Sequence, residues 1–184
     1  MKLTRWDTKE TIYESEHDTI KECVVDAIKK GVNLFRVDLI DANMAGANMA
    51  GANMTCANMI GADMTCANMA GANMIDADMR GAILTDADMV GANLKCANMT
   101  GAVLRGAILT DADMAGADLD FSSWPLWRGS CEVKLDKKNN ERFAYYCMVN
   151  MSAEVLADFL QNPVEFANRF AERKGISKIK RGEK

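Results

Sequence analysis

The sequence predicts an all-β solenoid with a cap at each end, and three observations carry this prediction. Residues 32–121 repeat in units of five without an insertion, through eighteen units. The third position of a unit is Met eleven times and Leu seven times, and the first position is Ala in sixteen units. The flanking residues 1–31 and 122–184 lack the repeat, so we expect an N-terminal cap, a repeat region and a C-terminal cap with a helical segment and a basic tail.

The five-residue period is incompatible with a continuous helix or a simple strand. A helix of 3.6 residues per turn would spread the unit around its whole circumference, and a strand repeats every two residues. A coil with corners fits, because each unit then supplies one short side and one turn. The first and third positions lie two residues apart and therefore both point inward, where a small residue beside a large one lets the layers interdigitate. Asn or Asp at the second position and Gly, Asp or Cys at the fifth suit tight turns.

This pattern resembles the signature of the pentapeptide-repeat family, A(D/N)Lxx, over residues 32–121. The resemblance implies a right-handed quadrilateral β-helix with four units in each coil, and hence about 4.5 coils. The departure is Met in place of Leu at most third positions. Met is a volume-conserving replacement that costs less than about 1.5 kcal/mol per site, so we expect the fold to be retained.

Residues 1–31 are expected to form the N-terminal cap, because a solenoid exposes its core at both ends. Lys2–Trp6 and Thr11–Ser15 are expected to pair as a hairpin. The sequence from Thr19 to Glu22 has the form of a capping box, and apolar residues at helical spacing follow it. The resulting helix is expected to end at Gly31 and to place its apolar side on the first coil.

Residues 122–184 are expected to close the other end of the solenoid. Trp124 and Trp127 follow the last unit directly and predict a lid over it. The remaining residues have helical patterns, with a helix start at Ser152 and another after Pro163. The basic residues from Arg173 onward are expected to form a solvated end.

Charge is concentrated on the repeat, where residues 32–124 hold eleven Asp, no Glu and four basic residues. With twenty residues per coil, one face collects five of these aspartates: Asp38, Asp41, Asp78, Asp118 and Asp120. Such a face either imitates a nucleic-acid backbone or uses Asp and Asn interchangeably as turn residues. The net charge corresponds to about one charge per 3 Å of solenoid, roughly half the density of duplex DNA, which favours the turn interpretation.

Three units have an aliphatic residue at the second position, where the others have Asn or Asp: Ile83, Val103 and Ile108. Ile83 and Val103 are expected to stack one coil apart, and Ile108 is expected to lie round the next corner. Exposed apolar residues that gather on a surface can mark an interface. The alternative is that the C-terminal helices cover them, and the sequence leaves both interpretations open.

Catalytic and metal-binding motifs are missing from the sequence. It has no P-loop, GxGxxG or HExxH motif, and His17 is its single histidine. The eleven methionines of the repeat lie at core positions, which favours packing over soft-metal binding. We therefore expect no enzyme activity, no cofactor and no metal. The absence of a long apolar run and of a signal-like start predicts a cytoplasmic protein with reduced thiols and no membrane partner.

The leading functional interpretation is a non-catalytic protein that acts through protein–protein interaction with a partner that the sequence does not name. The family resemblance implies an alternative, because some members imitate B-DNA, bind DNA gyrase and protect it from quinolones, and several form dimers through their C-terminal ends. DNA gyrase or another DNA-binding protein would then be the partner, and a homodimer would form through the C-terminal segment. The acidic solenoid is not expected to bind nucleic acid directly.

Two features of the chain argue against a surface tuned to gyrase. It lacks the loop insertions that the plasmid-borne resistance members use on gyrase, so no gyrase-contacting residue transfers to a position here. The sequence RGAILTDADM also occurs twice, at residues 80–89 and 105–114. This offset of five units places the copied residues one face over, which a specific recognition surface would tolerate poorly.

Overall fold

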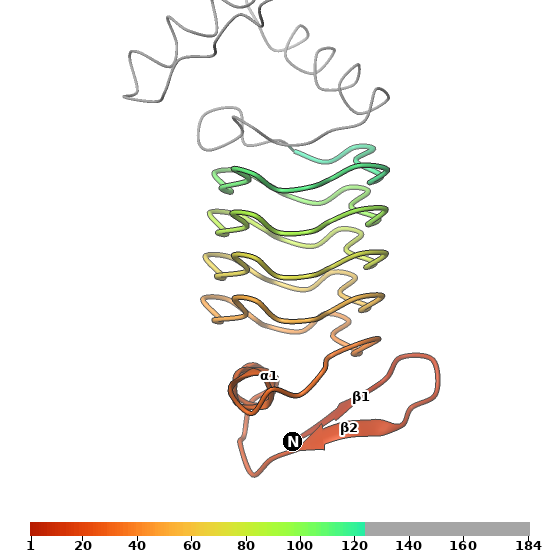
Figure 1. The fold of residues 1–184 in the computed structure, drawn as a ribbon, viewed down its shortest axis with the longest axis vertical. Helices are drawn as coiled ribbons and strands as arrows, with labels where there is room; N and C mark the ends of the chain where they lie inside the picture. The colour runs from red at the N-terminus through yellow and green to blue at the C-terminus, as the bar shows by residue number, and fades with distance from the viewer. Residues whose placement is uncertain (124–184) are drawn as a thin grey trace, which may run out of the picture. The chain divides into compact units, whose positions relative to one another are not determined.

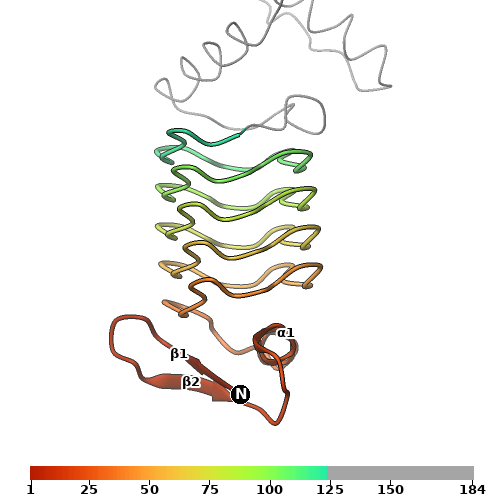
Figure 2. The same ribbon diagram turned by 180° about the vertical axis from the view of Figure 1, so that it is seen from behind.

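The computed structural model describes residues 1–123, all within the first of two compact units of the chain, Met1–Asn140. Strand β1 (Lys2–Thr4) pairs antiparallel with strand β2 (Thr11–Glu14), and helix α1 (Ile20–Lys29) follows (Figure 1). These elements lie at one end of a stack of short coils, as both views show (Figure 2). Within the described residues no helix is both long and apolar enough to cross a bilayer. The expected lid, C-terminal helices and basic tail lie outside them.

Parallel backbone pairing joins each coil to the next at a spacing of twenty residues. Asn43 pairs with Asp63, Asp63 pairs with Ile83, and the other parallel bridges keep the same offset. The N–H of Met44 donates to the Asp63 carbonyl at 2.7 Å, and the Asp63 N–H donates to the Ala42 carbonyl at 3.0 Å. Four units therefore form each coil, which confirms the β-helix solenoid predicted from the repeat.

The corners of the coils lie at the fifth position of each unit. Every fifth-position residue from Arg36 to Phe121 has a positive φ, between 52° and 74°. A backbone hydrogen bond closes each turn, as from the Ala47 N–H to the Met44 carbonyl at 2.9 Å. Positive φ favours Gly and is tolerated by Asp, which explains why these two residue types fill most of the corners.

The core of the solenoid consists of the first and third positions of the units. All third-position side chains, from Leu34 to Leu119, are buried, and so are the sixteen first-position alanines. The inward direction predicted for both positions is thereby confirmed. The interior is a continuous column of aliphatic and thioether groups packed coil upon coil, and its burial supplies the main stabilisation of this part of the chain.

The hairpin and α1 cover the first coil and bond to its free backbone groups. The Thr4 carbonyl accepts a hydrogen bond from the Asp38 N–H at 2.8 Å, and the Lys21 ammonium donates to the Ala45 carbonyl at 2.6 Å. In higher coils the equivalent N–H and carbonyl groups bond to the coil below. The N-terminal residues thus replace a missing coil, which satisfies an edge that would otherwise be open.

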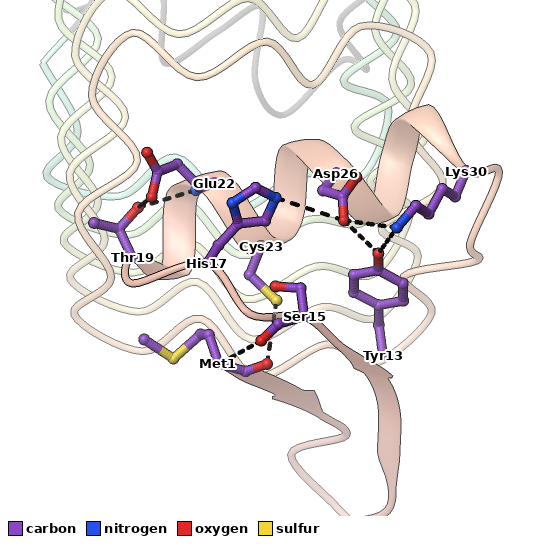
Figure 3. A network of polar contacts seen from close by, with 9 residues as sticks. All are labelled: Met1, Tyr13, Ser15, His17, Thr19, Glu22, Cys23, Asp26 and Lys30. Atoms are coloured by element: carbon purple, nitrogen blue, oxygen red, sulfur yellow. Dashed lines mark hydrogen bonds and ion pairs between the residues drawn. The ribbon is translucent and has the colours of Figure 1, made fainter.

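A polar network joins β2 to α1 within this cap (Figure 3). Asp26 accepts hydrogen bonds from the Tyr13 hydroxyl and from the Lys30 ammonium, the latter at 3.0 Å, and the His17 ring lies 3.6 Å away. The bonds from Tyr13 and Lys30 hold the pKa of Asp26 below its ordinary value. At the start of α1, the Thr19 hydroxyl accepts the Glu22 N–H at 3.2 Å, which caps the helix.

The cysteines of the described residues are all free thiols: Cys23, Cys56, Cys66 and Cys96. Cys56 and Cys96 share a corner column but lie two coils, or about 9–10 Å, apart, which exceeds disulfide reach. Among residues 1–123 no group of three or more His, Cys, Asp or Glu is placed to hold a metal ion.

We expect a thiol titration of the denatured protein, prepared without reductant and protected from air, to count all six thiols of the chain. The reason is the separation of the solenoid cysteines and the burial of Cys23. A count of four or fewer would contradict this expectation and would point to Cys23, Cys131 or Cys147, the last two of which lie outside the described residues.

Candidate interaction surfaces

The structure brings three of the five predicted acidic-face residues into one column. Asp38, Asp78 and Asp118 occupy the second position of stacked units, with an asparagine between each pair. Their carboxylates are therefore separated by two coils, about 9–10 Å. Asp41 lies at a corner with a positive φ, and Asp120 lies at the fourth position beside Asp118. The stacking that the spacing predicted is present, but the column alternates charged and neutral groups.

Cations lie beside Asp38 and Asp78 in this column. The Lys9 ammonium lies 2.9 Å from Asp38 Oδ2, and the Arg80 guanidinium binds Asp78 through Nη2 at 2.7 Å and Nε at 2.8 Å. Exposed ion pairs of this kind add little stability, but they cancel local charge. The repeat could not assign Lys9 to this face, because the hairpin loop brings Lys9 to Asp38 across 29 residues.

The second-position aspartates form the same local bond as the asparagines. Asp63 Oδ1 accepts the Thr65 N–H at 3.0 Å, just as Asn68 Oδ1 accepts the Ala70 N–H at 3.0 Å. Hydrogen bonds from the Thr65 hydroxyl and N–H hold the pKa of Asp63 below its ordinary value. Four more aspartates accept the N–H two residues on: Asp78, Asp88, Asp113 and Asp118. These bonds favour the turn interpretation of the acidic residues.

The predicted apolar residues separate into a pair and a single residue. Ile83 and Val103 pair in adjacent coils, and 39% and 36% of their surfaces are exposed. Ile108 pairs instead with Asp88 on the next face, and it is half-buried. The structure therefore joins Ile83 and Val103 into one exposed strip and excludes Ile108 from it.

Sequence reasoning did not single out two exposed residues next to this strip. Phe121 lies at the corner just before Ser123, which pairs with Val103 in the adjacent coil. The exposed fraction of Phe121 is 85%. Arg105 is exposed and forms no ion pair within residues 1–123. The other basic side chains of the repeat each pair with an aspartate: Arg36 with Asp7, Arg80 with Asp78 and Lys95 with Asp113. Phe121 could have been noticed as the one aromatic residue at a fifth position.

The fold and its inward column define this part of the chain as a β-helix solenoid of five-residue units. A family model described as pentapeptide repeats matches it in eight copies, over residues 33–69, 62–101 and 87–120. Through these residues the chain belongs to the pentapeptide-repeat family.

Solved structures of other pentapeptide-repeat proteins are similar to parts of this chain. HetL from the cyanobacterium Nostoc sp. strain PCC 7120, involved in heterocyst differentiation regulation, is 29% identical over 46% of this chain and 38% of its own, with a TM-score of 0.45. Rfr23 from the cyanobacterium Cyanothece 51142 is 29% identical over 56% of this chain and 63% of its own, with a TM-score of 0.26.

QnrB1, a plasmid-mediated fluoroquinolone resistance protein, is 16% identical in a trypsin-treated form, over 78% of this chain and 65% of its own, with a TM-score of 0.28. The chain thus spans less than two thirds of the length of each of these three structures. No curated protein matches the sequence.

Proposed function

We propose that this pentapeptide-repeat protein is a non-catalytic binding protein that contacts another protein through the outer faces of its solenoid. The observation that carries the proposal is the division between the inside and the outside of each coil. The first and third positions are buried and almost uniform, whereas the second and fourth positions point outward and vary. The side chains that a partner can recognise therefore lie on the outer faces of the solenoid.

The faces are also rigid, which suits recognition. Backbone hydrogen bonds on both sides hold each displayed residue against those one coil above and below it. A surface that is ordered before binding loses little conformational entropy when a partner docks. The exposed free thiols of Cys66 and Cys96 support a reducing location, which we propose is the cytoplasm.

Four face-exchange variants test this proposal. Each variant replaces the second- and fourth-position residues of one face with Asn and Thr, which occupy many of these positions already. We expect all four variants to melt within a few degrees of the parent protein, and one of them to lose a partner that the immobilised parent protein retains from cytosol of the source organism. Retention that survives in all four variants would show that the solenoid faces are not the binding surface.

A DNA-mimicking regulator of gyrase or another DNA-binding protein is the second candidate function. The alignment of Asp38, Asp78 and Asp118 in one column supports it. Lys9 and Arg80 oppose it, because they place positive charge beside Asp38 and Asp78. The turn bond of Asp118 gives that side chain a structural role as well.

A triple variant, in which Asn replaces Asp38, Asp78 and Asp118, decides between the two candidate functions. Asn already fills the alternate places of this column, so we expect the variant to fold, with changes within about 0.5 kcal/mol per site. In a gyrase supercoiling assay, with and without a quinolone, we expect parent and variant to give the same result. Inhibition of gyrase by the parent protein that the variant has lost would establish the DNA-mimic candidate instead, because its effect depends on these charges.

A further inference from the structure

We propose that two copies of this chain associate, antiparallel, through the face that carries Ile83, Thr85, Val103 and Arg105, here named the Ile83 face. The inference deepens the proposed function, on which it rests for the role of the faces as binding surfaces. It specifies that the binding partner of this particular face is a second copy of the chain.

The Ile83 face departs from the rule that most units follow. At most second positions an Asn or Asp oxygen accepts the N–H two residues on, but Ile83 and Val103 have no oxygen to offer to Thr85 and Arg105. Neither side chain contributes to the core, because both point outward and remain more than a third exposed. The solenoid therefore gives up two local hydrogen bonds for apolar surface, and such departures are expected where a surface has a task beyond folding.

Two charges of opposite sign that form no ion pair within residues 1–123 lie beside the apolar strip. Arg105 is the one basic side chain of the repeat without an ion pair in the described residues. Asp86 is exposed at the adjoining corner, and its carboxylate lies over Gly106, between the coils of Ile83 and Val103. No ion pair joins Asp86 to Arg105 within the described chain. Neither charge is neutralised within residues 1–123, and each lies where it can pair with a copy that docks on this face.

The Ile83 face is complementary to the same face of a second copy that is related to it by a two-fold rotation. A two-fold axis that runs across the face, midway between the two coils, places Ile83 of one copy against Val103 of the other, and the reverse. The same operation sets Arg105 opposite Thr85 of the second copy, beside the Asp86 carboxylate of that copy. A two-fold interface requires each contact to occur twice, and here the apolar contact and the ion pair both do.

The corners beside the face fit the same arrangement. The two-fold rotation sets the exposed Phe121 over Gly61 of the second copy, where the Asp41 carboxylate of that copy lies against the corner. One coil further out, Asp63 faces Ser123, so no two carboxylates oppose each other along this column. Charge complementarity therefore favours this face for self-association.

The size of the face sets the expected strength. A strip of two side chains with a polar rim belongs to the small, transient class of interfaces, below about 1,200 Å² in total. We therefore expect a monomer–dimer equilibrium that depends on protein concentration, with a dissociation constant in the micromolar range or weaker.

Sedimentation velocity of the full chain across a wide range of concentrations tests the proposal. We expect the parent protein to shift from monomer to dimer, and the variant Ile83→Asn/Val103→Asn to remain monomeric throughout. Asn is the residue type that these positions usually hold, so this variant should fold, which its thermal melt verifies. Val90→Thr is the matched control, because Val90 is a similarly exposed aliphatic residue on another face, and we expect it to associate like the parent protein.

Charge exchange supplies the second arm of the test. Arg105→Asp alone should weaken the dimer tenfold or more, and Arg105→Asp combined with Asp86→Arg should restore it, because the pair forms again with reversed signs. Arg36 occupies a corner with the same positive φ, so Arg is tolerated at position 86. A parent protein that stays monomeric, or an Ile83→Asn/Val103→Asn variant that still dimerises, would overturn the self-association. Either result would leave the proposed function to its own test by face exchange.

Discussion

Met74→Asp is expected to prevent folding of the solenoid. Met74 is fully buried, and the inward residues one coil below and above it are Met54 and Leu94. An aspartate at this position would bury an unpaired carboxylate between aliphatic layers, at a cost of several kcal/mol. Domains of this size are stable by only about 5–15 kcal/mol, so the loss approaches the whole margin. Circular dichroism during thermal unfolding and size-exclusion chromatography would show a protein without a cooperative transition.

Met74→Leu is the matched control for this variant. Leu already occupies seven of the eighteen third positions, so we expect a change of less than about 1.5 kcal/mol. Small and equal shifts in the unfolding temperature of Met74→Asp and Met74→Leu would mean that the third position does not face the interior. The assignment of inward and outward positions along the whole solenoid would then be wrong.

Gly106→Val is expected to be the second most damaging single change. Gly106 has a φ of 73°, and a Cβ atom there would lie 2.1 Å from Asp86 Oδ1. The left-handed conformation costs an ordinary residue about 1–2 kcal/mol, and a β-branched side chain is poorer still. Adding the displacement of the Asp86 carboxylate, we expect a loss of roughly 3 kcal/mol, measurable by urea denaturation.

Gly91→Asn separates the two contributions to this loss. Gly91 has a similar φ of 63°, but a Cβ atom there would meet nothing within 4 Å, and Asn tolerates this conformation. We expect it to cost less than about 1 kcal/mol. The double variant Gly106→Val/Asp86→Gly should recover the part of the loss that the carboxylate causes. If Gly106→Val were as mild as Gly91→Asn, the described packing at this corner would be contradicted.

The repeat was sufficient to predict the solenoid because its determining contacts are periodic. Each coil packs against an almost identical coil twenty residues away, so one rule places every inward side chain from Leu34 to Leu119. The same periodicity predicted that Asp38, Asp78 and Asp118 share a column and that Ile83 stacks on Val103.

The periodicity could not predict which aspartates of the acidic column have a cation beside them. Lys9 reaches Asp38 from a hairpin loop that does not repeat, and the bond from Trp6 Nε1 to the Cys56 carbonyl, at 2.8 Å, spans 50 residues. Contacts of this kind depend on how the N-terminal cap packs against the first coil. The five-residue repeat does not specify that packing.

The sequence by itself thus determined the coil, its core and the columns of its faces, because a five-residue rule repeated eighteen times leaves a single periodic packing. The tertiary structure alone decided which charges on those faces are paired. Arg80 and Lys95 find an aspartate within reach, whereas Arg105 finds none among the described residues. The physical reason is that backbone hydrogen bonds repeat with the coil, whereas an ion pair requires two particular side chains to meet at one place.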